Sequence, residues 1–136
     1  MKKDNIRDYA VCAFRYYASL SCPKTKEAAR FALQRQNLTR GRSSAKLRAS
    51  DAELLDLYAV LDTIAIISKM EHGADILDTL QNVYFTKPET DVQRGEIENR
   101  VLFTSYKSHI SSATAYRYLA LCRRIFAQAR GLRLAA

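Results

Sequence analysis

The residues of this chain best suited to do chemistry are alanines and arginines that alternate near its C-terminus. They recur at spacings of four, three and four residues, so a helix would place them on one face. On such a face the small alanines permit close approach, while arginine reaches guanine N7 and O6 or a phosphate oxygen. The pattern therefore favours reading of double-stranded DNA in its major groove. The stripe consists of Ala113, Arg117, Ala120 and Arg124, and Ser112, Tyr116 and Arg123 flank it.

Two plainer explanations of these residues stay open. Arginines on a helix are often no more than a solvated face, which would leave Arg117 and Arg124 without a ligand. Tyr116 lies about 100° around the helix from the expected core, so packing across a helix boundary explains it equally well.

No catalytic or metal-binding motif competes with the DNA interpretation. The chain has no Gly-rich phosphate loop, no H-E-x-x-H sequence and no D-x-D pair. Its cysteines form no C-x-x-C pair, and only two histidines are present to complete a zinc site. We therefore expect neither enzyme activity nor a metal or cofactor. Cys12 and Cys122 fall inside helical apolar patterns, so we expect both to be buried, reduced and unliganded.

The distribution of charge says more than the net charge of +8. Residues 1–50 hold twelve Lys or Arg against three acids, and residues 51–100 hold four against eleven. Residues 101–136 hold six Lys or Arg and no acid. An acid-free C-terminal third indicates a surface for a polyanion, most often nucleic acid.

Composition and length define the fold class. Four glycines and two prolines are too few for the turns of a many-stranded β-fold, so the chain should be all-α. Its 136 residues can bury a core without a disulfide or metal. The longest apolar stretch, residues 57–67, is shorter than the ~20 residues of a membrane span, and no signal peptide is recognisable at the start. We expect a cytoplasmic protein with no membrane contact.

Four helices are expected before residue 87. Apolar residues at three- and four-residue spacing from Ile6 to Leu20 predict the first, and Pro23 suits the first turn of a second that ends near Asn37. The apolar face of this second helix includes Phe31. Residues 39–50 are basic, small and polar without periodicity, which is typical of a linker or arm. Its basic residues are Arg40, Arg42, Lys46 and Arg48.

The third helix should be the most buried, spanning residues 51–71. A Ser50–Glu53 capping box begins it, its sequence is apolar nearly all round, and Gly73 should end it in a left-handed conformation. A shorter fourth helix follows at residues 76–84. The acids of residues 51–100 either complement the basic helices within the chain or form a contact surface for RNA polymerase or a second subunit.

The last forty residues predict two helices joined by a short turn. Apolar residues, Ile97, Val101, Leu102 and Tyr106, define the first helix. A turn follows around residues 107–109, then Ser111 caps a helix that Gly131 stops. Its core stripe should be Ala115, Leu119, Cys122 and Phe126. Two helices with such a turn, the second capped and basic, form a helix-turn-helix.

The segment ISSATAYRYL, residues 110–119, resembles the start of the recognition helix in region 4 of sigma factors. The longer run of residues 94–132 resembles phage-encoded transcriptional regulators of the ArpU and RinA type. This resemblance implies sequence-specific DNA binding near late promoters. By position, Ser112, Ala113, Tyr116 and Arg117 would face base edges, and Arg123 and Arg124 the backbone.

Together these features predict an all-α fold with an N-terminal bundle over residues 1–86 and a DNA-binding helix-turn-helix over residues 90–136. The expected function is transcriptional regulation of the sigma-like phage or prophage type. The basic arm of residues 39–50 is as well explained as a solvated linker as by phosphate binding. A small-terminase-like packaging component or a helical protein-interaction module are the alternatives, and a homodimer is left open.

Overall fold

The computed structural model describes residues 5–39, 51–86 and 95–132, and all regular structure in these ranges is helical. The helices are α1 (Asn5–Ser19), α2 (Lys26–Thr39), α4 (Asp51–Ser68), α5 (Gly73–Tyr84), α6 (Glu96–Ser108) and α7 (Ser112–Arg130). The all-α prediction is confirmed for the described residues. None of these helices combines the length and apolar character needed to cross a bilayer.

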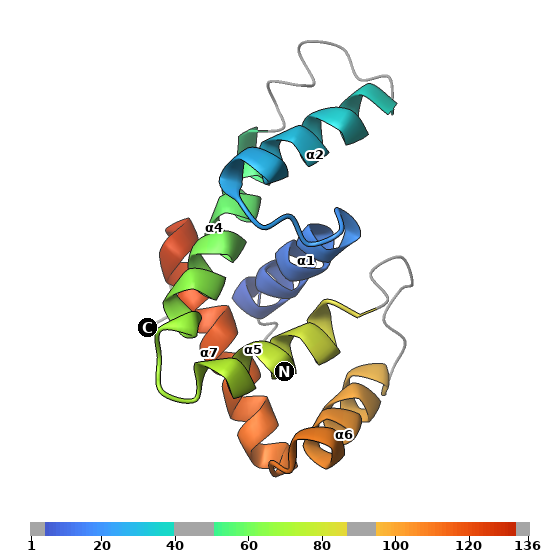
Figure 1. The fold of residues 1–136 in the computed structure, drawn as a ribbon, viewed down its shortest axis with the longest axis vertical. Helices are drawn as coiled ribbons and strands as arrows, with labels where there is room; N and C mark the ends of the chain where they lie inside the picture. Colours follow the sequence, from blue (N-terminus) through green and yellow to red (C-terminus); the bar gives the residue numbers. More distant parts are fainter. Residues whose placement is uncertain (1–4, 40–50, 87–94, 133–136) are drawn as a thin grey trace.

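One hydrophobic core contains residues of the first described helix, α1, and of the last, α7. Helix α7 packs against α1, α4, α5 and α6, and α4 runs beside it (Figure 1). The ring of Phe14 in α1 lies 5.4 Å from that of Phe126 in α7 and 5.7 Å from that of Tyr84 in α5. Described residues of both predicted regions, the bundle of residues 1–86 and the helix-turn-helix of residues 90–136, contribute to this core.

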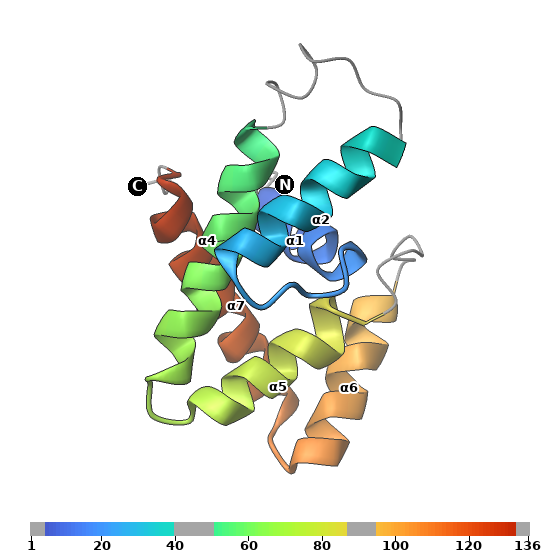
Figure 2. The same cartoon turned by 45° about the horizontal axis from the view of Figure 1, so that its top comes forward.

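Helix α6 lies at one end of the molecule, beside α5 (Figure 2). The C-terminal end of α2 and the N-terminal end of α4 lie at the opposite end in both views (Figures 1 and 2). The basic residues predicted to form an arm, Arg40, Arg42, Lys46 and Arg48, fall outside the described residues, as does Ser50 of the predicted capping box.

The turn between α4 and α5 differs from its prediction. Helix α4 ends at Ser68, and His72, not Gly73, adopts the left-handed conformation, with φ of 61°. Gly73 instead begins α5, where a Cβ atom would lie 2.2 Å from the carbonyl oxygen of Ile67. Glycine is required here because the backbones approach so closely, not because of its conformational freedom.

The prediction that the third helix is the most buried is wrong, because α4 buries five of its 18 residues whereas α5 buries six of its 12. Leu57 and Val60 of α4 are fully buried, but Leu55 is 50% exposed and Ile66 is 47% exposed. A stretch of apolar residues has no periodicity from which to find the covered side, so its burial was overestimated.

Three further positions near the N-terminus depart from the sequence analysis. Pro23 precedes α2 rather than occupying its first turn, since Thr25 accepts the capping hydrogen bond from the Ala28 N–H at 3.0 Å. Phe31 is exposed, and Cys12 is exposed rather than buried. The buried face of α1 is narrower than its apolar pattern suggested, so Cys12 falls at its solvent-facing edge.

Candidate nucleic-acid interface

Helices α6 and α7 meet at a turn of three residues, His109 to Ser111. His109 takes the left-handed conformation, with φ of 58°, and its N–H donates to the Ser105 carbonyl. The Ile110 N–H donates to the same carbonyl, while the Ser105 hydroxyl donates to the Ile110 carbonyl. Histidine therefore fills the position that glycine often takes, and Ser105 closes the turn.

The start of α7 is capped as predicted. The Ser111 hydroxyl oxygen accepts a hydrogen bond from the Thr114 N–H at 3.0 Å, and the same hydroxyl donates to Thr114 Oγ1 at 2.9 Å. Gly131 ends the helix with φ of 81°, which confirms the predicted stop. Both ends of α7 are thus fixed by local hydrogen bonds.

The core stripe of α7 is confirmed residue by residue. Ala115, Leu119, Cys122 and Phe126 are all at most 1% exposed. Burial raises the pKa of the Cys122 thiol to about 12, so this cysteine is a protonated, hydrophobic core residue. No three His, Cys, Asp or Glu side chains gather as a metal site would require in the part of the chain that is described.

Most of the predicted contact residues lie on the opposite side of α7. Because the stripe opposite a buried stripe must face solvent, the core of α7 fixes its position. The exposed members are Ala113, Tyr116, Arg117 and Arg124, and the partly exposed members are Ser112, Ala120 and Arg123. Tyr116 is 42% exposed, which favours a free surface over packing across a helix boundary.

The two central arginines of this face have different surroundings. Arg117 donates to Thr114 Oγ1 at 3.0 Å, so the threonine that contacts the Ser111 cap also directs the guanidinium toward the start of the helix. Arg124 is exposed and pairs with no acidic side chain of the described residues. Thr114 is not among the predicted contact residues, although its spacing of three residues from both Ser111 and Arg117 is a signal for these contacts.

Arg123 is turned away from this face. Its Nη1 donates to the Tyr84 hydroxyl of α5 at 2.8 Å, and Tyr84 itself is 3% exposed. Burial raises the pKa of Tyr84 while the Arg123 guanidinium opposes that rise. Arg130 is likewise engaged, with its Nε 2.7 Å from Asp56 Oδ1 in α4. These two arginines tie α7 to the core, leaving Arg117 and Arg124 as its outward cations.

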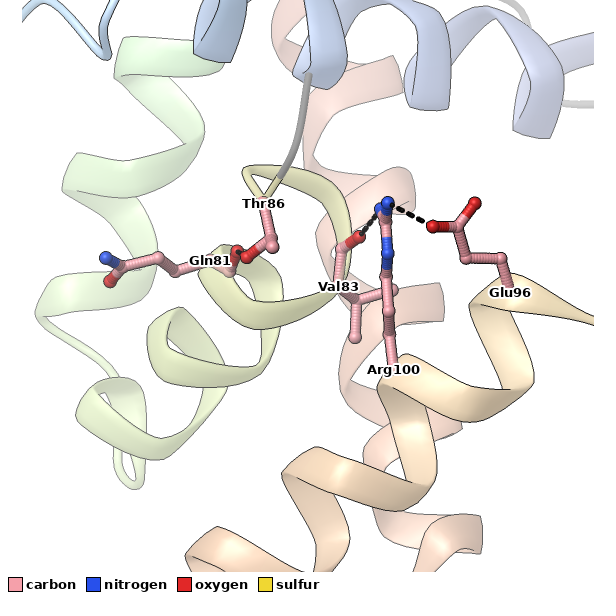
Figure 3. A network of polar contacts seen from close by, with 5 residues as sticks. All are labelled: Gln81, Val83, Thr86, Glu96 and Arg100. Atoms are coloured by element: carbon pink, nitrogen blue, oxygen red, sulfur yellow. Dashed lines mark hydrogen bonds and ion pairs between the residues drawn. The ribbon is translucent and has the colours of Figure 1, made fainter. Parts of the chain in front are cut away.

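Helix α6 is held against α5 at both ends. Arg100, 8% exposed, donates from Nη1 to the Val83 carbonyl at 2.8 Å and from Nη2 to Glu96 at 3.1 Å (Figure 3). At the other end the Ser108 hydroxyl donates to Asp78 at 2.8 Å. The orientation of the turn and of the first residues of α7 is therefore set from α5.

Part of the apolar pattern predicted for α6 is not covered. Val101 is 1% exposed, but Leu102 is 58% exposed and Tyr106 is 89% exposed.

Searches of family models, curated proteins and solved structures found nothing that matches this chain. The function of this chain must therefore be inferred from the geometry of α6 and α7.

Proposed function

We propose that this chain is a sequence-specific DNA-binding transcriptional regulator that reads the major groove with the N-terminal half of α7. The observation that carries the proposal is the division of α7 into a buried stripe and an outward stripe of alanine and arginine. No acidic residue follows Glu98 in the chain, so nothing on α7 itself repels a phosphate backbone.

The arrangement of α6 and α7 supports a helix-turn-helix mode of binding. A three-residue turn joins the two helices, and the second begins at the Ser111 cap with no acidic residue in its first turn. In this mode the first residues of the second helix contact base edges while neighbouring groups hold phosphates. Ala113 and Ala120 allow the helix to enter the groove, and Arg117, directed by Thr114, points toward the base-contacting end.

Arg124 has a different role in the proposal. It lies two turns further along the same face, where a helix leaves the groove and passes the backbone, so it serves as a phosphate contact. The positive end of the α7 dipole adds attraction for phosphate at Ser112. The resemblance to region 4 of sigma factors agrees with this division of roles and extends the proposal to contact with RNA polymerase.

The test is binding to duplex DNA at several salt concentrations, on a site selected from random sequences and on unrelated duplexes. Arg124→Ala should weaken binding to all duplexes alike and reduce the slope of log affinity against log salt by about one. Arg117→Ala should cost about 1–3 kcal/mol on the selected site and relax its specificity.

Arg35→Ala is the matched control, because Arg35 is an exposed arginine on α2. It should leave affinity and slope near their wild-type values. Equal affinities for wild type and all three variants, independent of salt, would show that this face of α7 does not bind DNA.

A further inference from the structure

The solvent-facing side of α6 carries an apolar surface that the described part of the chain does not cover. Leu102 is 58% exposed, Phe103 is 62% exposed and Tyr106 is 89% exposed. Their positions lie within about 100° around the helix axis. Large apolar side chains scattered singly over a surface are ordinary, but three together on one helix indicate an interaction site.

This surface cannot be buried by rotating α6. Arg100 is nearly buried and bonded to the Val83 carbonyl and to Glu96 (Figure 3). Ser108 is bonded to Asp78, so the helix is fixed to α5 near both ends. Breaking either contact would leave polar groups without partners. A cover for the apolar surface must therefore come from outside this set of helices.

A hollow of about 450 Å³ lies beside Phe103, at the other end of the same surface from Tyr106. Its walls come from α6, from α5 and from Thr86, and they include Asn99, Arg100 and Asn82. The Asn82 side-chain nitrogen is buried there and has no hydrogen-bond partner.

We infer that α6 is a self-association surface on which two copies of this chain pack antiparallel about a two-fold axis. If the axis passes between Leu102 and Phe103, positions equally far from that midpoint face each other. Tyr106 of each copy then lies opposite Asn99 of the other, at the hollow. The phenol ring fills the hollow beside Phe103.

The charges on α6 favour this second copy as the occupant. Exposed Glu98 and partly buried Glu96 lie in the first turn of the helix, and exposed Lys107 lies in the last. Antiparallel packing brings the acidic turn of each copy to the basic turn of the other, whereas parallel packing would place like charges together. The exposed apolar residues and the opposite charges lie on α6, and the hollow adjoins this helix, so one surface can pair with its own copy as a two-fold interface requires.

This inference does not depend on DNA binding, and sedimentation velocity of the full chain between about 1 and 100 µM tests it directly. The wild-type chain should dimerise. Tyr106→Ala should raise the dimer dissociation constant at least about tenfold, since a buried aromatic side chain dominates a small interface. Tyr106→Phe, which retains the ring and loses the hydroxyl, should have a smaller effect.

Charge reversal tests the antiparallel register. Lys107→Glu should weaken the dimer, because it places an acid beside Glu96 of the other copy, and Glu96 lies within about 20° of Lys107 around the helix axis. Glu98→Lys, on the opposite side of α6 from Lys107, should have a smaller effect. Phe31→Ala removes a side chain of similar exposure, 63%, from α2 and is the control that should change nothing. Circular dichroism should show folded variants throughout, since these side chains are mostly exposed.

A wild-type chain that remains monomeric at about 100 µM would overturn the inference and leave the surface to a different protein. A dimer that Tyr106→Ala does not weaken would also overturn it. A dimer that Lys107→Glu leaves as stable as the wild type would overturn the antiparallel register. None of these results would bear on the proposed DNA contacts of Arg117 and Arg124.

Discussion

Arg123 of α7 and Tyr84 of α5 form a hydrogen bond of 2.8 Å. This bond gives Arg123 different surroundings from Arg124, the next residue in the sequence. Arg123 faces a hydroxyl at the edge of the core, whereas Arg124 faces solvent. A helical wheel predicts both as phosphate contacts, because Arg123 flanks the outward stripe. The bond to Tyr84 gives Arg123 a structural role as well, and no pattern within α7 could have revealed it.

Arg123→Ala should therefore act mainly on stability. It leaves the hydroxyl of Tyr84, a residue 3% exposed, without this partner, and such a loss costs about 1–3 kcal/mol. Tyr84→Phe should cost less, and the double variant should lose less than the two single losses combined. Urea denaturation of the four proteins measures this coupling. If Arg123→Ala keeps wild-type stability but reduces the salt slope of DNA binding by one, Arg123 is a phosphate contact after all.

Gly73→Ala should destabilise the fold near the upper end of the about 1–3 kcal/mol range for overpacking. The new Cβ would lie 2.2 Å from the Ile67 carbonyl oxygen, a backbone atom that cannot swing away. Thermal or urea denaturation measures the loss. Gly131→Asn provides the contrast, since φ of 81° suits asparagine and nothing lies within 4 Å of the added Cβ. Similar losses in both variants would show that the contact with Ile67 does not limit the turn.

Stability should fall as the solution becomes alkaline. Burial raises the pKa of Cys122 from 9.0 to about 12 and that of Tyr17 from 10.0 to about 12. The Tyr17 hydroxyl also donates to the Pro23 carbonyl at 2.7 Å. A raised pKa in the folded state gives stability that is present in full below the unfolded pKa and is lost as pH rises through the folded one.

The loss should begin above about pH 9 for Cys122 and pH 10 for Tyr17 and continue to about pH 12. Each group should contribute a slope of up to about 1.4 kcal/mol per pH unit. Cys122→Ala and Tyr17→Phe should flatten the curve of unfolding free energy against pH, each over its own window. Curves parallel to that of the wild type would show that the pKa values of these two groups do not differ between the folded and unfolded states.

The sequence was most informative where a local rule fixes the backbone. Ser111 as a cap, Gly131 as a stop and the buried stripe through Leu119 all follow from interactions within one helix, and the structure has them as predicted. A hydrogen bond between residues a few positions apart does not depend on which elements pack nearby, so the sequence alone can predict it.

The wrong predictions concern residues whose burial or conformation depends on a neighbouring element. Apolar periodicity identified α6, but it could not tell that Leu102 and Tyr106 have no cover within the described chain. Cys12 lies just outside the contact made by α1, and Gly73 is needed because of a carbonyl on α4. In each case the decisive atom belongs to another element, so a pattern read along one helix does not contain it.

The position of α7 among four other helices means that its outward face cannot loosen separately from the rest of the molecule. A helix on the periphery can fray while the remaining fold persists, but unwinding α7 would expose the interior of the described structure. Any ligand that binds the outward stripe therefore stabilises the whole fold. The melting temperature should rise as the ligand concentration exceeds the dissociation constant. Amide exchange would slow in α1 and α4 as much as in α7, although neither is part of the proposed contact.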